Sequence, residues 1–178
     1  MNEEKTNGLV QIYTGNGKGK STAAFGLSLR AAGCGMRTVI VQFMKKGEWY
    51  GEIEGFKQVP LVEIYSFGTG NFLKKGSPPD DQNVFLAAAA MNKAKEIMCR
   101  DDVDILILDE LNNAIYFDLV SEGAALELLG ARPDCLEIVI TGRNAPDSLI
   151  NVADLVTEMQ EIKHPYQKGI QARKGIEF

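Results

Sequence analysis

A glycine-rich segment between two regular patterns constrains this 178-residue chain more than any other feature. An apolar run at residues 8–13 leads into Gly15, Gly17 and Gly19, and small and apolar residues then recur at helical spacing over residues 20–31. Because glycine adopts positive φ without strain, three glycines in five residues let the backbone curl and point successive N–H groups at one spot. The segment therefore predicts a strand, an anion-binding turn and a helix in direct succession.

The loop at residues 15–22 carries groups that suit a polyphosphate. Lys20 adds a positive charge, Ser21 supplies a hydroxyl for Mg²⁺, and the helix that follows contributes the positive end of its dipole. The spacing of the standard P-loop is not met, because that motif requires glycine where Thr14 stands, and Gly15 comes one residue late. The alternative is a tight strand-to-helix turn whose lysines bind no ligand.

Two further apolar runs end in charged residues. Residues 103–108 contain four consecutive aliphatic residues, which indicate a strand buried on both faces, and Asp109 and Glu110 follow. Open α/β sheets bind ligands at the carboxyl ends of their strands, and in P-loop proteins an acid at this position meets the Mg²⁺ held by the loop hydroxyl. The alternative is a helix-capping Asp-Glu pair. Arg143 comes just after the run at residues 136–141. We expect it to contact a phosphate or a ribose, and the alternative is a surface salt bridge.

The remaining patterns alternate strands and helices along the whole chain. Further strands are expected at residues 37–43, 61–67 and 155–159, and helices at residues 80–98, 112–119, 121–129 and 146–152. This alternation predicts an α/β fold with a mostly parallel sheet of about six strands and helices on both faces. We expect a single domain over residues 1–178, with a flexible leader at 1–7 and a basic tail near the nucleotide site at 160–178.

Two long loops are expected, at residues 44–60 and 68–79. The first mixes charged residues with Trp49 and Tyr50, which is the composition of a substrate lid. A solvated excursion with Trp49 folded onto the core is the alternative. The only histidine, His164, lies in the tail and is expected to be a packed loop residue, not a catalyst.

Composition excludes several classes of function. The formal net charge of −5 at pH 7 argues against general binding of nucleic acid or anionic membranes. No apolar run reaches the roughly 18–20 residues of a membrane span, and the N-terminus lacks an apolar signal segment, so we expect a cytoplasmic location. Cys34, Cys99 and Cys135 include no Cys-x-x-Cys pair, which argues against a disulfide framework or a cysteine zinc site. We predict that all three are buried structural thiols.

The glycine loop and several other segments match one family. They are residues 13–26 (YTGNGKGKSTAAFG), 41–47 (VQFMKKG), 108–112 (LDELN), 140–143 (ITGR), 153–159 (ADLVTEM), and the tail from 163–166 (KHPY) to 175–178 (GIEF). Together they resemble the P-loop corrinoid adenosyltransferases, and the shortened glycine loop is the form that this family carries. The resemblance implies a RecA-like P-loop fold, usually a homodimer. It implies transfer of the 5′-deoxyadenosyl group of Mg-ATP to the Co(I) centre of a reduced corrinoid, with triphosphate leaving whole, in adenosylcobalamin biosynthesis or salvage.

The resemblance also implies roles for residues of the ATP site. Lys20 would neutralise the triphosphate, and Ser21 with Glu110 would ligate Mg²⁺, with Asp109 as the second choice. No general base is needed, because the cobalt nucleophile carries its own electron pair. The residues expected to contact ATP are Gly15, Asn16, Gly17, Lys18, Gly19, Lys20, Ser21, Thr22 and Arg143.

For the corrinoid the resemblance is less direct. Many members carry an aromatic-x-tryptophan pair where this chain has Asn71-Phe72-Leu73, so we expect Phe72, together with Phe67, to contact the corrinoid. A flavoprotein or another external reductant is the implied partner. The alternative functions are a P-loop ATPase or small-molecule kinase, which would release phosphate or a phosphorylated product, and a non-catalytic module that binds nucleotide or carries a corrinoid.

Overall fold

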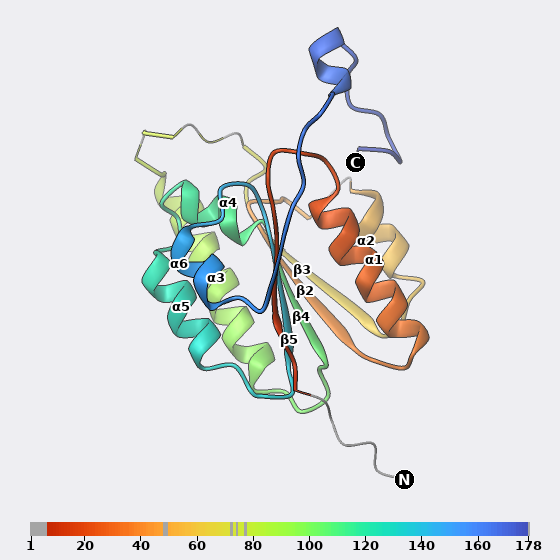
Figure 1. Ribbon diagram of the computed structural model, residues 1–178, viewed down its shortest axis with the longest axis vertical. Helices are drawn as coiled ribbons and strands as arrows, with labels where there is room; N and C mark the ends of the chain where they lie inside the picture. The colour runs from red at the N-terminus through yellow and green to blue at the C-terminus, as the bar shows by residue number, and fades with distance from the viewer. Residues whose placement is uncertain (1–6, 48–49, 72, 74, 77, 178) are drawn as a thin grey trace.

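The computed structural model describes residues 7–47, 50–71, 73, 75–76 and 78–177. In these ranges six parallel strands form one sheet in the order β3-β2-β4-β5-β1-β6 (Figure 1). The strands are β1 (Val10–Thr14), β2 (Thr38–Phe43), β3 (Val62–Phe67), β4 (Ile105–Asp109), β5 (Glu137–Thr141) and β6 (Leu155–Glu158). The α/β class, the parallel sheet and the number of strands agree with the prediction from the sequence.

Helices cover both faces of the sheet, as predicted. The helices α1 and α2 lie on one face, and α3, α4, α5 and α6 lie on the other (Figure 1). Their bounds are α1 (Lys20–Gly33), α2 (Gly51–Phe56), α3 (Asp81–Met98), α4 (Leu111–Tyr116), α5 (Glu122–Gly130) and α6 (Asp147–Val152). Two short elements were not predicted: α2 lies within the expected loop at 44–60, and a 3-10 helix, η1 (Pro165–Lys168), lies within the tail.

The central strands are buried on both faces. Every residue of β2 and β4 is buried. Along β4 the side chains alternate, so that Leu106 and Leu108 pack with the apolar faces of α3 and α5, whereas Ile105 and Ile107 pack with α1. This confirms the strand predicted from four consecutive aliphatic residues, and it places Asp109 at the end of a rigid, fully covered element.

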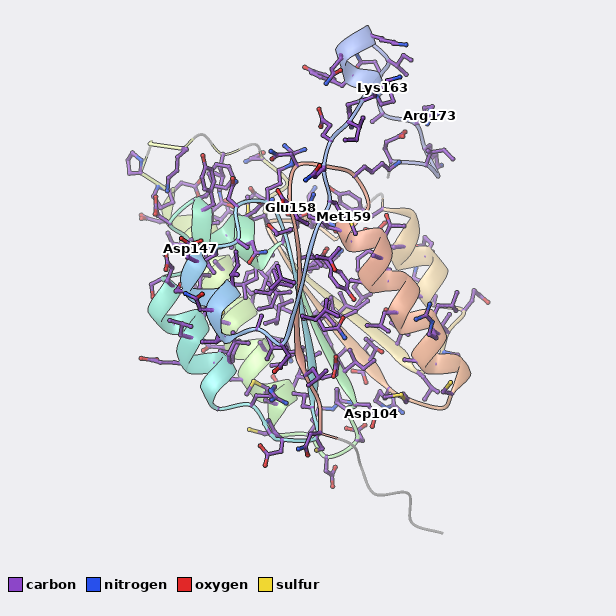
Figure 2. The ribbon with its side chains drawn as sticks, viewed as in Figure 1. Asp104, Asp147, Glu158, Met159, Lys163 and Arg173 are labelled. Atoms are coloured by element: carbon purple, nitrogen blue, oxygen red, sulfur yellow. The ribbon has the colours of Figure 1, made fainter. Side chains whose placement is uncertain are left out.

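The parallel direction brings all six carboxyl ends to one edge of the sheet. The loop after β1, the end of β4 and the end of β5 therefore converge, with β5 between the other two strands. Glu158 and Met159, at the end of β6, lie at the same edge, and the tail residues Lys163 and Arg173 lie beyond it (Figure 2). A ligand site at this edge follows from the topology.

The prediction of buried cysteines is wrong, because all three are exposed. Cys34 and Cys99 are the C-cap residues of α1 and α3, and Cys135 lies in the turn before β5. Their apolar neighbours in the sequence belong to the adjoining helix or strand, and the chain has already left the core at these positions.

Every helix of the described ranges falls short of the length or the apolar character that crossing a membrane requires.

Candidate functional site

The glycine loop packs tightly against the backbone that follows β6. The amide of Gly17 donates to the carbonyl of Met159 at 2.6 Å. A Cβ atom on Gly17 would lie 2.7 Å from the carbonyl oxygen of Gln160, and one on Gly15 would lie 2.5 Å from that of Met159. Gly15 and Gly19 also have φ angles of 91° and 118°, which favour glycine. Close approach and backbone conformation thus both explain the spacing seen in the sequence.

Lys20 lies inside the loop. Its side-chain nitrogen donates to the carbonyls of Gly15 at 2.8 Å and Gly17 at 2.7 Å, and the residue is only 8% exposed. Burial, and next the charge of Arg143, lower the pKa of Lys20. The N-cap of α1 is Gly19, so no capping side chain competes for the first N–H groups of the helix. The loop therefore offers backbone donors and one enclosed cation.

Asp109 is fully buried and surrounded by donors. Lys45 Nζ donates to its Oδ2 at 2.8 Å and the Gln42 amide at 3.1 Å, while the Thr141 hydroxyl donates to Oδ1 at 2.7 Å. The Ser21 hydroxyl also lies near this carboxylate and helps to stabilise its charged form. Burial alone would raise the pKa of Asp109, but Lys45 and the hydroxyl donors hold it below its usual value. Asp109 thus links the loop hydroxyl to Lys45.

Glu110 differs from its neighbour. It is the N-cap of α4, with a φ of 66° that is unfavourable for a residue other than glycine, and its carboxylate accepts a hydrogen bond from the Asn113 amide. Its backbone N–H donates to the Thr141 hydroxyl at 2.9 Å. Burial, followed by the charge of Asp109, raises the pKa of Glu110. The strained backbone turns this second carboxylate towards the cavity that the glycine loop lines.

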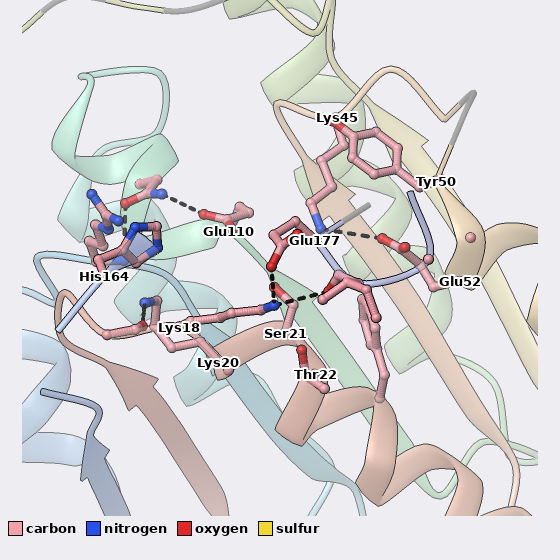
Figure 3. Close-up of a pocket in the computed structure, with 18 residues that line it drawn as sticks. Lys18, Lys20, Ser21, Thr22, Lys45, Tyr50, Glu52, Glu110, His164 and Glu177 are labelled. Atoms are coloured by element: carbon pink, nitrogen blue, oxygen red, sulfur yellow. Dashed lines mark hydrogen bonds and ion pairs between the residues drawn. The ribbon is translucent and has the colours of Figure 1, made fainter. Parts of the chain in front are cut away.

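The cavity that the glycine loop lines, which we call the first cavity, has a volume of about 570 Å³ (Figure 3). Its wall includes most of the residues expected to contact ATP, together with residues of α2, α4 and the tail. The lining residues are Gly17, Lys18, Gly19, Lys20, Ser21, Thr22, Phe25, Lys45, Tyr50, Gly51, Glu52, Glu110, Asn113, Arg143, His164, Gly175, Ile176 and Glu177. Three of the residues predicted to contact ATP or Mg²⁺ do not line it: Asn16 faces the second cavity, Gly15 accepts the bond from Lys20, and Asp109 is buried.

A second cavity of about 630 Å³ adjoins the first. Its wall is richer in apolar and aromatic side chains. The lining residues are Asn16, Phe43, Met44, Lys45, Tyr50, Gly70, Asn71, Leu73, Glu110, Asn113, Tyr116, Phe117, Arg143 and Asn144. Five of these line both cavities: Lys45, Tyr50, Glu110, Asn113 and Arg143. We call these five residues the shared wall.

Of the two residues expected to contact the corrinoid, the structure describes only Phe67. Phe67, the last residue of β3, lines neither one and packs against the main apolar cluster instead. Phe72 lies outside the described residues, as does Trp49 of the expected lid. The neighbours of Phe72 in sequence, Asn71 and Leu73, line the second cavity.

The tail closes one side of the first cavity. Lys18 Nζ donates to the carbonyl of Ile176 at 3.0 Å and to Oε1 of Glu177 at 3.1 Å. His164 lines the cavity and accepts a hydrogen bond from the backbone N–H of Tyr166 at 3.2 Å, so it caps η1 while also facing the site. Its sequence context indicated only a packed loop residue, and the position beside the cavity comes from the path of the tail.

Local sequence patterns did not single out Lys45 and Asn113 as site residues. Lys45 comes two residues after β2 at the carboxyl edge, and the argument that singled out Arg143 could have found it. Arg143 itself lines both cavities and is exposed, and we see no ion pair between it and another described residue. Its position thus favours a ligand contact over a surface salt bridge.

Comparison with known proteins agrees with this geometry. The sequence model of the family described as ATP:corrinoid adenosyltransferase BtuR/CobO/CobP matches residues 6–178. The chain is 39% identical over 174 residues to a corrinoid adenosyltransferase from Sinorhizobium sp, covering 96% of this chain and 80% of the relative. It is 37% identical over 171 residues to one from Pseudomonas aeruginosa, covering 96% and 84%. Corrinoid adenosyltransferase CobA of Salmonella typhimurium is 31% identical over 175 residues, covering 98% and 88%.

Proposed function

The chain belongs to the ATP:corrinoid adenosyltransferases, enzymes that use ATP to adenosylate a corrinoid, and we propose how its two cavities divide that reaction. The first cavity takes ATP and the second takes the reacting face of the corrinoid. The observation that carries the proposal is the shared wall, because two substrates that react directly must meet across one boundary. The products are the adenosylated corrinoid and intact triphosphate.

The loop side of the first cavity supplies the charge that triphosphate departure requires. A polyphosphate leaves carbon readily only if preorganised donors and cations meet its developing charge. Lys20 is enclosed by the loop and Lys18 stands at its rim, while the free N–H groups of α1 open towards the same space. We assign triphosphate binding to residues 15–22 and to Arg143 on this basis.

The oxygen donors beside the loop fit Mg²⁺. The Ser21 hydroxyl and the Glu110 carboxylate line the same cavity, and hard oxygen ligands are those that Mg²⁺ prefers. Within the described ranges no group of three or more His, Cys, Asp or Glu residues is arranged to hold a metal alone, so the remaining ligands would come from the nucleotide and water. We propose Ser21 and Glu110 as ligands; Asp109, the second choice, is already saturated with donors. When bound, the ion would neutralise charge on the leaving triphosphate.

The apolar side of the second cavity suits the corrinoid. Phe43, Met44, Tyr116 and Phe117 form a surface that would exclude water from the ring and from its lower axial position. Phe72 stays in this proposal because both of its neighbours line the cavity, whereas Phe67 is replaced by these four residues. The cobalt carries its own electron pair, so the reaction requires no side chain as a general base.

Three further features belong to the proposal. We propose a homodimer, which is supported by the edge strand β6, where all four residues are exposed and Leu155 and Val156 are each 40% exposed. An external reductant, a flavoprotein or another, would supply the Co(I) state. We place this single-domain enzyme in the cytoplasm, with its tail from residue 160 onwards beside the nucleotide.

One spectrophotometric experiment tests the function. Pre-reduced cobalamin is mixed with Mg-ATP and the protein, and we expect the Co(I) band to disappear while triphosphate accumulates in equal amount. Release of inorganic phosphate or of a phosphorylated product without a Co–C bond would indicate an ATPase or kinase. Binding of ATP with no turnover of the Co(I) band would indicate a non-catalytic module.

A further inference from the structure

Lys45 is one of the two cations of the shared wall and lines both cavities. Its Nζ lies 2.8 Å from Asp109 Oδ2. The same atom lies 3.6 Å from Oε1 of Glu52, a pair that Figure 3 shows. The same atom lies 5.6 Å from the ring centroid of Phe25 and 5.5 Å from that of Tyr50. Its side chain is 16% exposed. The ammonium is thus enclosed by two carboxylates and two aromatic rings.

A third carboxylate, that of Glu110, also acts on this ammonium through its charge. Asp109 is fully buried, and an unpaired charge there would be strongly unfavourable. Although burial lowers it, the charges of Asp109, Glu110 and Glu52 raise the pKa of Lys45 above its usual value, so Lys45 is charged at neutral pH.

The proposed metal ligands adjoin the same cluster. Ser21, Glu110 and Lys45 line the same cavity, the Ser21 hydroxyl helps to stabilise the charged form of Asp109, and Glu110 follows Asp109 in the chain. A divalent cation on Ser21 and Glu110 would therefore lie close to the Lys45 ammonium, and like charges at such a distance repel. A triphosphate in the first cavity would add the negative charge that offsets this repulsion.

We propose that Lys45 is the resident cation of this carboxylate cluster, and that it makes binding of the divalent ion depend on the nucleotide. Lys45 satisfies Asp109 before substrate arrives, and the metal enters only together with ATP. Lys45 is a positioning residue in this account, since it acts through Asp109 and through its charge. The inference rests on the proposed ATP site and is independent of the chemistry at cobalt.

Mn²⁺ binding, followed by the electron paramagnetic resonance of the free ion, tests the inference. Lys45→Met removes the charge and keeps the apolar stem, and Lys45→Arg keeps the charge. Mn²⁺ is titrated into each protein with and without ATP, and no corrinoid is present. The affinity of ATP itself for Mn²⁺ is the same for every variant and cancels from the comparison.

We expect Lys45→Met to bind Mn²⁺ without ATP at least about tenfold more tightly than wild type, because one nearby unit charge has been removed. The factor by which ATP tightens Mn²⁺ binding should fall correspondingly. By reciprocity, the factor by which Mn²⁺ tightens ATP binding should fall by the same amount. Lys45→Arg should retain the wild-type behaviour. A lysine with only a structural role would change stability and leave this metal–nucleotide coupling unchanged.

A second variant covers the case in which Lys45→Met does not fold. Lys45→Gln can still donate a hydrogen bond to Asp109 but carries no charge, and the same gain in Mn²⁺ affinity is expected. Unchanged Mn²⁺ binding in the folded neutral variants would overturn the inference. If wild type fails to adenosylate pre-reduced cobalamin, the proposed function fails instead, whatever the Mn²⁺ titrations show.

Discussion

The glycine loop at residues 15–22 and the tail at residues 163–177 face each other across the first cavity, yet they are built differently. The loop is held by buried contacts, such as the 2.6 Å bond from Gly17 to Met159 and the two bonds from Lys20 to loop carbonyls. Almost all of the tail is exposed, and it meets the loop through Lys18, whose side chain is 48% exposed.

This difference separates two tasks of a binding site. Buried, fully paired polar groups hold their geometry because breaking them leaves unsatisfied atoms. Exposed ion pairs contribute only about 0–1 kcal/mol, so a segment held by them opens at little cost. We infer that the loop meets the nucleotide preorganised, whereas the tail adjusts around it.

The largest expected effect comes from the enclosed lysine of the loop. Lys20→Ala should lower the rate of adenosyl transfer at least about tenfold, because it removes a charge that acts on the departing triphosphate. The rate is measured with pre-reduced corrinoid and saturating Mg-ATP. Lys18→Ala is the matched control at the rim, and its loss should be smaller. Equal losses would show that the enclosed position gives no advantage.

Substitutions of the two adjacent carboxylates, Glu110 and Asp109, should affect different properties, the first the reaction rate and the second the stability. Glu110→Gln should lower the rate at least about tenfold while leaving stability close to wild type, since its carboxylate faces the cavity. Asp109→Asn should chiefly lower the free energy of unfolding, because it removes the charged partner nearest to the Lys45 ammonium. Urea unfolding and turnover are measured on both. Near-normal activity in Glu110→Gln would move the metal role to Asp109.

Two glycine substitutions, Gly17→Ala and its control Gly26→Ala, test whether close backbone packing fixes the conformation of the loop. Gly17→Ala would place a Cβ atom 2.7 Å from the Gln160 carbonyl oxygen, so ATP affinity and thermal stability should both fall. Gly26 lies within α1, and a Cβ atom added there would meet no described atom within 4 Å beyond the backbone of its own helix. Gly26→Ala should raise stability by about 0.5–1 kcal/mol and leave ATP affinity unchanged. A tolerated Gly17→Ala would contradict a rigid loop.

Features encoded by local sequence patterns could be predicted, whereas contacts between distant parts of the chain could not. The loop and β4 were predictable because each is a local pattern, three glycines after a strand or four aliphatic residues before Asp109. Pairing of Lys45 with Asp109 joins residues 64 positions apart through the register of β2 and β4, which no local pattern encodes. Phe67 was expected at the corrinoid from the family resemblance, whereas in the structure its side chain packs against the main apolar cluster.

The smallest expected effect tests the tail. Glu177 stands beside the triphosphate loop, where its carboxylate holds Lys18 and would repel a bound triphosphate. Glu177→Gln should therefore strengthen ATP binding by at most about fivefold, the range of one exposed ion pair, and the gain should shrink as salt rises. Glu161→Gln is the control, because Glu161 lies just before the tail, accepts a hydrogen bond from the Gln167 side chain and does not line the cavity. Isothermal titration at low and high salt measures both. If Glu177→Gln instead weakens ATP binding more than about tenfold, a loss beyond what one exposed pair explains, the tail holds the nucleotide as firmly as the loop does.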